Sequence, residues 1–386
     1  MHVLSVEWLA VMAGCVGIYW LLPARLRDLW VVVLTAGFLA VLDPRSLALL
    51  VGFTLVTWAA GRLPAARRRL VFYAVGAMVV ALVGYKLEVG QSPVSDLADV
   101  VIPLGMSYYT LRCIHYLLDR YRGTAPAASL FELAAYLFFL PTIIAGPIHR
   151  SAPFIRDLHR KTWQANDISR GLERILYGYV KIAFIANFAI AGLSNYLLTQ
   201  IDDNNAALQL YIATIAGGLN LYFQFSGFSD VAIGFALLLG YRVIENFDRP
   251  FLQRNLGLFW QRWHISLTSL SREYVYMPLV GLTRNPYLAS YAAFIAIGLW
   301  HSISLNLVAW GAYNATGIIV WQEWKKLGRR LAVPPVRTEP WRAALHVFSV
   351  LLTAHYFLFG YFFIGYNDLE AGLADYYTML FAWWLP

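Results

Sequence analysis

The sequence predicts an all-α integral membrane protein with about ten to twelve transmembrane helices and additional re-entrant and interfacial helices. Its 386 residues are 59% hydrophobic and only 13% charged, whereas soluble domains are about 45–50% apolar and about 25% charged. Apolar runs near the length of about 20 residues that a membrane helix needs recur along the chain. Lys and Arg gather in short segments between these runs, as they do in cytoplasmic loops.

The predicted helical segments follow the apolar runs in chain order. They lie near residues 5–22, 29–42, 46–60, 70–87, 100–118, 131–147, 174–200, 207–240, 287–303, 304–322 and 343–366. The run 207–240 is long for one crossing and predicts a tilted or bent span, whereas 376–385 is short and fits the interface. We expect the first helix to stay in the protein, because its start is not basic and no small-residue cleavage site follows.

The segment AYLFFLPTIIAGPIHR, residues 135–150, predicts a broken or re-entrant helix. Pro141, Gly146 and Pro147 interrupt its apolar run, and the loops on both sides have a cytoplasmic composition. Irregular backbone at membrane depth is tolerated only where protein buries it or where it lines a cavity. We therefore expect this segment to be enclosed by other helices.

The charge pattern predicts the orientation in the membrane. Basic clusters occupy residues 61–70, 149–161, 241–262 and 323–330, and acidic loops occupy residues 87–100, 202–205 and 366–375. The positive-inside rule places the basic set in the cytoplasm and the acidic set outside. Because the charges fall in short loops between spans, nucleic-acid binding is a poor explanation of the net charge of +8, and we expect no nucleic-acid partner.

The chain is predicted to form a single polytopic membrane domain over residues 1–386. No internal repeat is visible, and no linker marks a second soluble domain. Residues 1–100 form scaffold helices without a concentrated polar signal, and residues 343–386 close the structure. Between them, dense polar and aromatic signatures interrupt the apolar runs of residues 101–322, where the family resemblance described below implies the catalytic core.

Two histidines stand out, because an ionisable side chain at membrane depth is a functional-site hypothesis by default. His264 lies in FWQRWHISL, residues 259–267, and His301 lies in IGLWHSISL, residues 297–305. Gly298 and Ser302 flank His301 at a spacing that lets helices approach closely. Burial keeps an imidazole neutral, so we expect His301 to be a buried base at a tunnel wall.

Eight further polar and aromatic residues are secondary candidates for lining a substrate tunnel. They are Trp260, Trp263, Arg262, Asn246, Trp300, Ser304, Asp230 and Gln224. On a helix, Trp260, Trp263, His264 and Leu267 would share one face. Simpler explanations compete: packing for the two tryptophans, an interhelical hydrogen bond for Asp230, and a turn for the segment that holds Asn246.

Metal chemistry and a bound cofactor are not predicted. The chain has no HExxH or CxxC motif, phosphate-binding loop or dinucleotide fingerprint. Its two cysteines, Cys15 and Cys113, lie in apolar segments and are expected to be small buried residues. The sequence leaves an enzyme, a proton-coupled secondary transporter and a non-catalytic scaffold as classes, and the absence of inverted repeats disfavours the transporter.

A long ordered string of motifs resembles the membrane-bound O-acyltransferase family. It runs from LNLYFQFSGFSD through ENFDRPF and FWQRWHISL to MPL, residues 219–279, and continues in GLWHSISLNLVAWGAYNA, residues 298–315. IPLGMSYYT and FFLPTIIAGPIHR upstream, and LLTAHYFLFGYFFI downstream, match the same family. The resemblance covers roughly residues 100–370. It is closest to the branch that includes alginate O-acetylases and the D-alanyl transferases of teichoic acids.

The resemblance implies a ring of tilted helices around a central tunnel. The family's catalytic histidine corresponds to His301, although the glycine that often follows it is Ser302 here, and its tunnel histidine corresponds to His264. The donor implied is acetyl-CoA or an acylated carrier protein, used as a co-substrate. Arg254, Arg262 and Arg272 are candidates to attract its phosphates, and anchoring at the cytoplasmic membrane surface explains them equally well. The acceptor implied is a hydroxyl of an extracytoplasmic glycan.

Further expectations follow from the same resemblance. The protein would lie in the inner (cytoplasmic) membrane and work with a second extracytoplasmic acyltransferase or another complex partner. D-Alanyl transfer to teichoic acid from a carrier protein is the alternative to acetyl transfer.

Overall fold

The computed structural model describes residues 6–90, 97–143, 146–202, 204–332, 338–365 and 369–384. These residues form helices and loops, and their only β-type pairing is an isolated bridge between Phe247 and Trp263. The predicted all-α class is confirmed. Five described helices are long and apolar enough to cross a membrane, namely residues 44–61, 66–87, 165–200, 206–238 and 339–365. The other predicted spans coincide with shorter or more charged helices, so ten to twelve crossings stay a prediction.

The chain separates into two compact units. The first contains Met1–Tyr179 and Gly227–Glu245, and the second contains Val180–Ser226 and Asn246–Pro386. The boundary falls within two long continuous helical stretches, residues 165–200 and 206–238. The single polytopic domain over residues 1–386 stays a prediction.

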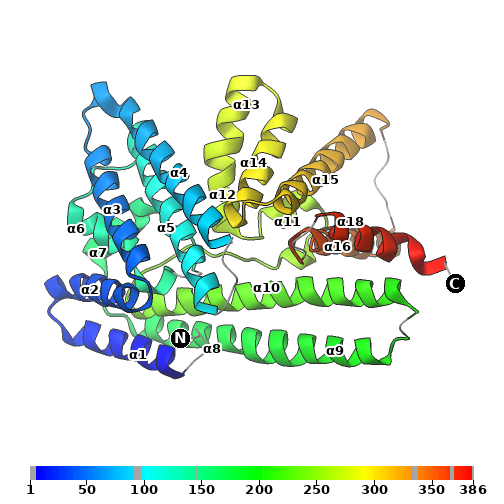
Figure 1. Cartoon of the computed structure of the whole chain (residues 1–386), viewed down its shortest axis with the longest axis horizontal. Coiled ribbons are helices and arrows are strands. Elements are labelled where there is room, and N and C mark those ends of the chain that lie inside the picture. The colour runs from blue at the N-terminus through cyan, green and yellow to red at the C-terminus, as the bar shows by residue number, and fades with distance from the viewer. Residues whose placement is uncertain are drawn as a thin grey trace. The chain divides into compact units, whose positions relative to one another are not determined.

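The first unit is built from the N-terminal helices (Figure 1). They are α1 (Val6–Leu21), α2 (Ala24–Leu42), α3 (Pro44–Gly61), α4 (Val71–Gly90), α5 (Leu97–Arg122), α6 (Leu130–Leu137), α7 (Ser151–Arg160) and α8 (Ala165–Tyr179). Helix α5 packs against both α3 and α4. Gly61 makes the α3 contact possible, since a Cβ atom there would lie 2.8 Å from the ring of Tyr116.

The predicted interruption of residues 135–150 is confirmed. Helix α6 ends at Leu137, a 3-10 turn covers Leu140–Thr142, and α7 begins at Ser151. The fully buried Arg112 of α5 donates a 2.9 Å hydrogen bond to the hydroxyl oxygen of Thr142. Residues 144–145 lie outside the described part of the chain.

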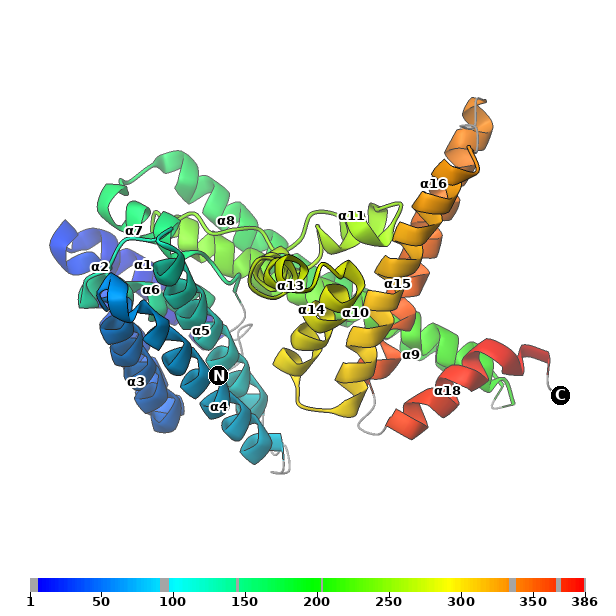
Figure 2. The same ribbon diagram turned by 90° about the horizontal axis from the view of Figure 1, so that it is seen from above.

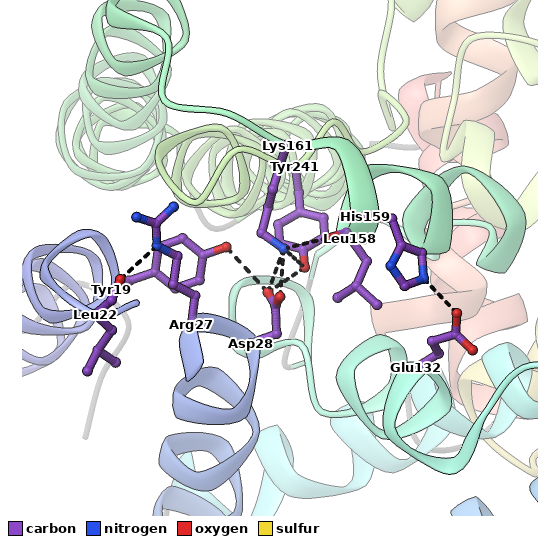
Figure 3. Close-up of polar contacts among 9 residues, drawn as sticks. All are labelled: Tyr19, Leu22, Arg27, Asp28, Glu132, Leu158, His159, Lys161 and Tyr241. Atoms are coloured by element: carbon purple, nitrogen blue, oxygen red, sulfur yellow. Dashed lines mark hydrogen bonds and ion pairs between the residues drawn. The ribbon is translucent and has the colours of Figure 1, made fainter. Parts of the chain in front are cut away.

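A buried polar cluster holds four segments of the first unit together (Figure 3). Lys161 forms a 2.7 Å ion pair with Asp28 of α2, and Tyr241 donates a 2.6 Å hydrogen bond to the same carboxylate. Tyr19 of α1 donates a further hydrogen bond to Asp28 at 3.3 Å. Loss of one partner from a buried ion pair costs about 3–5 kcal/mol. The cluster therefore holds Lys161 and Tyr241, which lie in the predicted cytoplasmic segments 149–161 and 241–262, against α1 and α2.

The second unit contains the segments in which the sequence predicted chemistry. A π-helix (Val180–Ile190) leads into α9 (Ala191–Gln200). The predicted long run 207–240 forms one helix, α10 (Ala206–Leu238), of 33 residues, which belongs to this unit up to Ser226. The remaining helices are α11 (Leu256–Trp260), α12 (Ile265–Ser271), α13 (Met277–Thr283), α14 (Pro286–His301), α15 (Leu305–Arg330), α16 (Glu339–Phe359), α17 (Phe362–Gly365) and α18 (Leu369–Phe381).

Helices α14 and α15 form a close antiparallel pair (Figure 2). Near the turn, a Cβ atom on Gly298 would lie 2.2 Å from the carbonyl oxygen of Leu307, which confirms the predicted close approach. Farther along, the hydroxyl groups of Tyr291 and Thr316 are 2.9 Å apart. Because the two helices are antiparallel, the basic C-terminal end of α15 is the end farther from His301.

Candidate functional site

His264 lies in a tight turn between two short helices. Helix α11 ends at Trp260, α12 begins at Ile265, and His264 between them has a φ of 43° in the left-handed region. The prediction that Trp260, Trp263, His264 and Leu267 share one helical face is therefore wrong. The helix is broken because the backbone around His264 pairs with another segment of the chain.

That segment is the predicted turn around Asn246. The Asn246 carbonyl accepts a 2.9 Å hydrogen bond from the amide of Ile265, and the amide of Asp248 donates to the carbonyl of Arg262 at 3.1 Å. The Asn246 side chain, which is fully buried, also accepts a 2.6 Å hydrogen bond from the Ser266 hydroxyl. Asn246 thus fixes the turn that carries His264 from both its backbone and its side chain.

The structure brings the two predicted histidines together. The ring centroids of His264 and His301 are 6.4 Å apart, and the Trp300 ring lies 5.9 Å from His264 and 4.6 Å from His301. The edge of Phe225 packs against His264 at 4.6 Å. The two imidazoles share an aromatic enclosure although they are distant in sequence.

His264 is almost completely buried, with 3% of its surface exposed. Burial, and secondarily the neighbouring His301, lowers the pKa of His264 well below its ordinary value, so its ring is neutral at physiological pH. Within the described part of the chain, its Nε2 atom has no hydrogen-bond partner. A neutral imidazole with this nitrogen protonated has a donor left for a substrate oxygen.

His301 is the last residue of α14, and its side chain is exposed. The expectation that it is buried in an apolar helix is wrong for this chain. The helix ends there because Ser302 is extended and Ser304 caps the next helix, accepting a 3.4 Å hydrogen bond from the amide of Leu307. The predicted Ser304 therefore has a structural role, and the exposed imidazole at a helix end is accessible to a second substrate.

A cavity of about 740 Å³ lies in the second unit, and neither histidine is among the residues that line it. Its wall is mainly apolar, with a few hydroxyl, amide and charged groups. It is lined by Gly257, Trp260, Gln261, Ile265, Thr268, Ser269, Ser271, Arg272, Glu273, Tyr276, Met277, Ser290, Ala293, Phe294, Ile297, Ile318, Trp321 and Gln322. Ile297 is one helical turn from His301, whereas Trp321 lies toward the basic end of α15, where Lys325 covers its ring at 4.6 Å. The cavity therefore extends from the basic end of the helix pair to Ile265, which follows His264 in the chain, and to Ile297.

The predicted tryptophans are both buried in an aromatic cluster. Trp263 stacks on Phe259 at 5.6 Å and contacts Phe357 at 4.4 Å, so packing explains it. Trp260 also packs in this cluster and in addition lines the cavity. Phe357 was not a predicted residue, because its apolar helix gives no signal that it reaches this cluster.

Arg262, Asp230 and Gln224 were also predicted to line the tunnel. Each forms a polar contact that gives it a structural role. Arg262 forms a 3.1 Å ion pair with Asp248. Asp230 belongs to the first unit, where it forms the interhelical contact favoured for it, a 2.6 Å ion pair with Arg174. In the second unit, Gln224 donates a 2.6 Å hydrogen bond to Asn187.

Two buried polar groups of the second unit were missed or undervalued in the analysis of the sequence. Asn314 of α15 is 1% exposed, and its Oδ1 atom has no hydrogen-bond partner among the residues described. Trp260 is 4% exposed, and its indole Nε1 is likewise without a partner in the described ranges. No signal in the sequence distinguishes a satisfied buried amide from an unsatisfied one. Over the described residues, no three His, Cys, Asp or Glu side chains gather as a metal site would require.

Comparisons with known proteins match most of the chain. The family model described as MBOAT, the membrane-bound O-acyltransferase family, matches residues 69–365. A probable alginate O-acetylase of Pseudomonas putida is 31% identical over 335 residues, which cover 79% of this chain and 67% of that protein. The corresponding protein of Pseudomonas aeruginosa is 33% identical over 58% of this chain and 43% of its own length.

The relatives with lower identity include a D-alanyltransferase. A teichoic acid D-alanyltransferase of Bacillus subtilis is 26% identical over 67% of this chain and 67% of that protein. The aligned part of the chain thus spans from under half to two thirds of these relatives' lengths.

Proposed function

Because the chain belongs to the membrane-bound O-acyltransferase family, we propose that it transfers an acyl group, acetyl in the first instance, from a cytoplasmic thioester donor to a polysaccharide hydroxyl. The acceptor is a cell-surface polysaccharide outside the cytoplasm, and the enzyme is a multi-pass protein of the inner membrane. The observation that carries the proposal is the His264–His301 pair, with ring centroids 6.4 Å apart; a largely apolar cavity in the same unit reaches Ile297, one helical turn from His301. Acetyl is preferred because the alginate O-acetylases share more identity with this chain than the D-alanyl transferases do.

In the proposed reaction, His301 is the general base. Its exposed imidazole takes the proton of the acceptor hydroxyl while the hydroxyl oxygen attacks the thioester carbonyl carbon. The carbon–sulfur bond then breaks as the ester forms, and the imidazolium of His301 gives the proton that it took to the leaving thiolate. The products are an O-acyl glycan and the free thiol of the donor.

His264 is proposed to stabilise the carbonyl oxygen as its negative charge develops. Its buried ring, the left-handed backbone and the two contacts from Asn246 fix the orientation of the Nε2 atom. A fixed donor in a site that excludes water stabilises developing charge more than a mobile one in solvent. His264 would act without carrying the proton itself.

The donor is proposed to enter the cavity from the basic end of α15. Arg272 lines the cavity, and Lys325 lies over Trp321 at the end distant from the histidines. Positive side chains at this end suit the phosphates of acetyl-CoA or of an acylated carrier protein. Arg262, by contrast, is paired with Asp248, which makes it a weaker candidate for that role.

D-Alanyl transfer to teichoic acid from a carrier protein is the second candidate function, and the Bacillus subtilis relative supports it. In either case we propose that a second extracytoplasmic acyltransferase or another complex partner completes the modification. The acidic loops predicted outside, together with the exposed His301, would face that partner or the glycan.

The direct test uses purified protein in liposomes with radiolabelled acetyl-CoA outside and a polysaccharide acceptor. We expect the wild type to label the glycan and His301→Ala to reduce transfer by at least about 100-fold, in the range of a lost general base. His346→Ala is the matched control, because His346 is an exposed histidine of α16 remote from the described site residues. Unchanged transfer by His301→Ala would remove the central claim.

A further inference from the structure

A polar cavity of about 280 Å³ lies in the first unit. It is bounded by the end of α7, the start of α8 and the turn that follows α10. The sequence predicts that the two basic segments that contribute to it, 149–161 and 241–262, face the cytoplasm. Four basic and two acidic side chains line the cavity, namely Arg156, Arg160, Lys161, Arg242, Asp157 and Asp167.

Two of the four cations are neutralised by carboxylates. Lys161 forms the 2.7 Å ion pair with the buried Asp28 (Figure 3). Arg156 forms a 3.4 Å ion pair with Asp157 through its Nε atom. A guanidinium group has five N–H donors, so Arg156 still has donors for a ligand in the cavity.

The other two cations differ in their partners. Arg242 forms a 3.4 Å ion pair with Asp167. Arg160 is exposed and forms neither a hydrogen bond nor an ion pair with any residue in the described part of the chain. The cavity therefore has one positive charge in excess, which a monoanion would balance. The start of α8 adds to this preference, because Gln164 and Asp167 line the cavity and a helix N-terminus favours an anion.

Apolar side chains beside the cavity indicate what kind of anion it takes. Trp163 is 55% exposed and lies in the chain between two residues of the cavity wall, Thr162 and Gln164. An exposed tryptophan is typical of the membrane–water interface. Farther along α8, Leu172 and Leu176 are 57% and 61% exposed and lie one turn apart on one face of the helix. In a multi-pass membrane protein such a face contacts acyl chains, so the cavity lies near the polar end of a lipid-facing surface.

We propose that this cavity binds the phosphodiester of an anionic phospholipid headgroup. Arg160 is its main charged contact, because the phosphodiester has a single negative charge and Arg160 supplies the unbalanced positive one. The acyl chains lie along Leu172 and Leu176, and Trp163 lies at the level of the headgroup. Soluble phosphate compounds share the headgroup chemistry but lack the acyl chains. The site is independent of the proposed acyl transfer, since none of the residues proposed for that reaction lines this cavity.

The test measures binding of phosphatidylglycerol, a singly charged phospholipid, to the purified full chain in detergent by native mass spectrometry. It compares wild type, Arg160→Gln and the matched control Arg170→Gln, since Arg170 is an exposed arginine of α8 that does not line the cavity. We expect Arg160→Gln to weaken binding about 5-fold, the effect of one basic contact to an anionic headgroup, and the control to stay within about 2-fold of wild type. Phosphatidylcholine, which has no net charge, should bind the wild type at least about 5-fold more weakly. Without lipid, the three proteins should unfold at the same temperature.

Two further ligands distinguish a lipid from a soluble phosphate compound. They are glycerophosphoglycerol, which is the same headgroup without acyl chains, and CoA. If either binds as tightly as phosphatidylglycerol, the cavity is a site for a soluble phosphate compound and the lipid assignment is wrong.

Four other results would also overturn the assignment. Equal losses in Arg160→Gln and Arg170→Gln would show a diffuse attraction to the basic surface, and equal binding of the two lipids would show that the headgroup charge is not recognised. A lower unfolding temperature of lipid-free Arg160→Gln would show that Arg160 has a structural partner. Absence of phosphatidylglycerol binding to the wild type would refute the site directly.

Discussion

At the scale of single residues, the site depends on one unusual backbone conformation. His264 has a φ of 43°, where a residue with a Cβ atom is strained. Such strain is found at functional sites and persists only where the surroundings impose it. Here Asn246 imposes it, through its carbonyl on Ile265 and its side chain on Ser266.

This arrangement predicts the effect of Asn246→Ala. The variant leaves the buried Ser266 hydroxyl without its acceptor, which costs about 1–3 kcal/mol of stability, and loosens the turn that orients His264. We expect kcat for acyl transfer to fall about 10-fold or more with a smaller change in donor KM. Thermal unfolding in detergent and steady-state kinetics measure the two effects.

Ser266→Ala and the double variant provide the control. If the two side chains act as one unit, the double variant should be no worse than Asn246→Ala. If the effects of the two single variants on kcat multiply in the double variant, Asn246 acts on His264 by a route that does not include Ser266.

The sequence predicted the two histidines but not their environments. An ionisable residue in an apolar run is visible in one segment, so His264 and His301 could be found without a structure. The left-handed turn was not predictable, because helical spacing favoured one continuous face and the contact from Asn246 is not local. The exposure of His301 was missed because the helix end at Ser302 lies inside an apolar run.

At the scale of elements, the α14–α15 pair determines where His301 and the cavity lie relative to each other. Gly298 permits this pair, since any Cβ atom would meet the Leu307 carbonyl oxygen at 2.2 Å. The sequence predicted this close approach from the spacing of small residues. It did not reveal that the partner helix would be the next one in the chain.

Gly298→Ala should separate the two helices. Since the obstacle is backbone rather than a flexible side chain, we expect a loss of about 1–3 kcal/mol of stability and reduced transfer. Gly328→Ala on the same α15 is the control, because a Cβ atom at Gly328 would meet nothing within 4 Å and alanine favours helix. Equal unfolding temperatures for the two variants would contradict the close contact.

At the scale of the whole molecule, the charge pattern predicts which ends of the helices face the cytoplasm. The basic end of α15 should face inward and the loop at residues 202–205 outward. The helical class followed from the composition and from the lengths of the apolar runs. The partition into two units did not, because it depends on contacts between segments far apart in sequence.

Single-cysteine labelling checks this orientation. Gly328→Cys should react with an impermeant maleimide only from the cytoplasmic side, and Asn205→Cys only from outside. The background is low, because the native Cys15 and Cys113 are 1% and 0% exposed. Labelling of both sites from one side would refute the predicted orientation.

The most direct test of the central claim, that His264 and His301 act together on one thioester, is a double-mutant cycle on acyl transfer in liposomes. With His301 as the base and His264 as the donor to the carbonyl oxygen, each single alanine variant should lower kcat, and the double variant should be slower than either, because the oxyanion donor still acts when the base is lost. An unchanged kcat for His264→Ala, or a double variant no slower than His301→Ala, would contradict the joint action of the two histidines on one thioester.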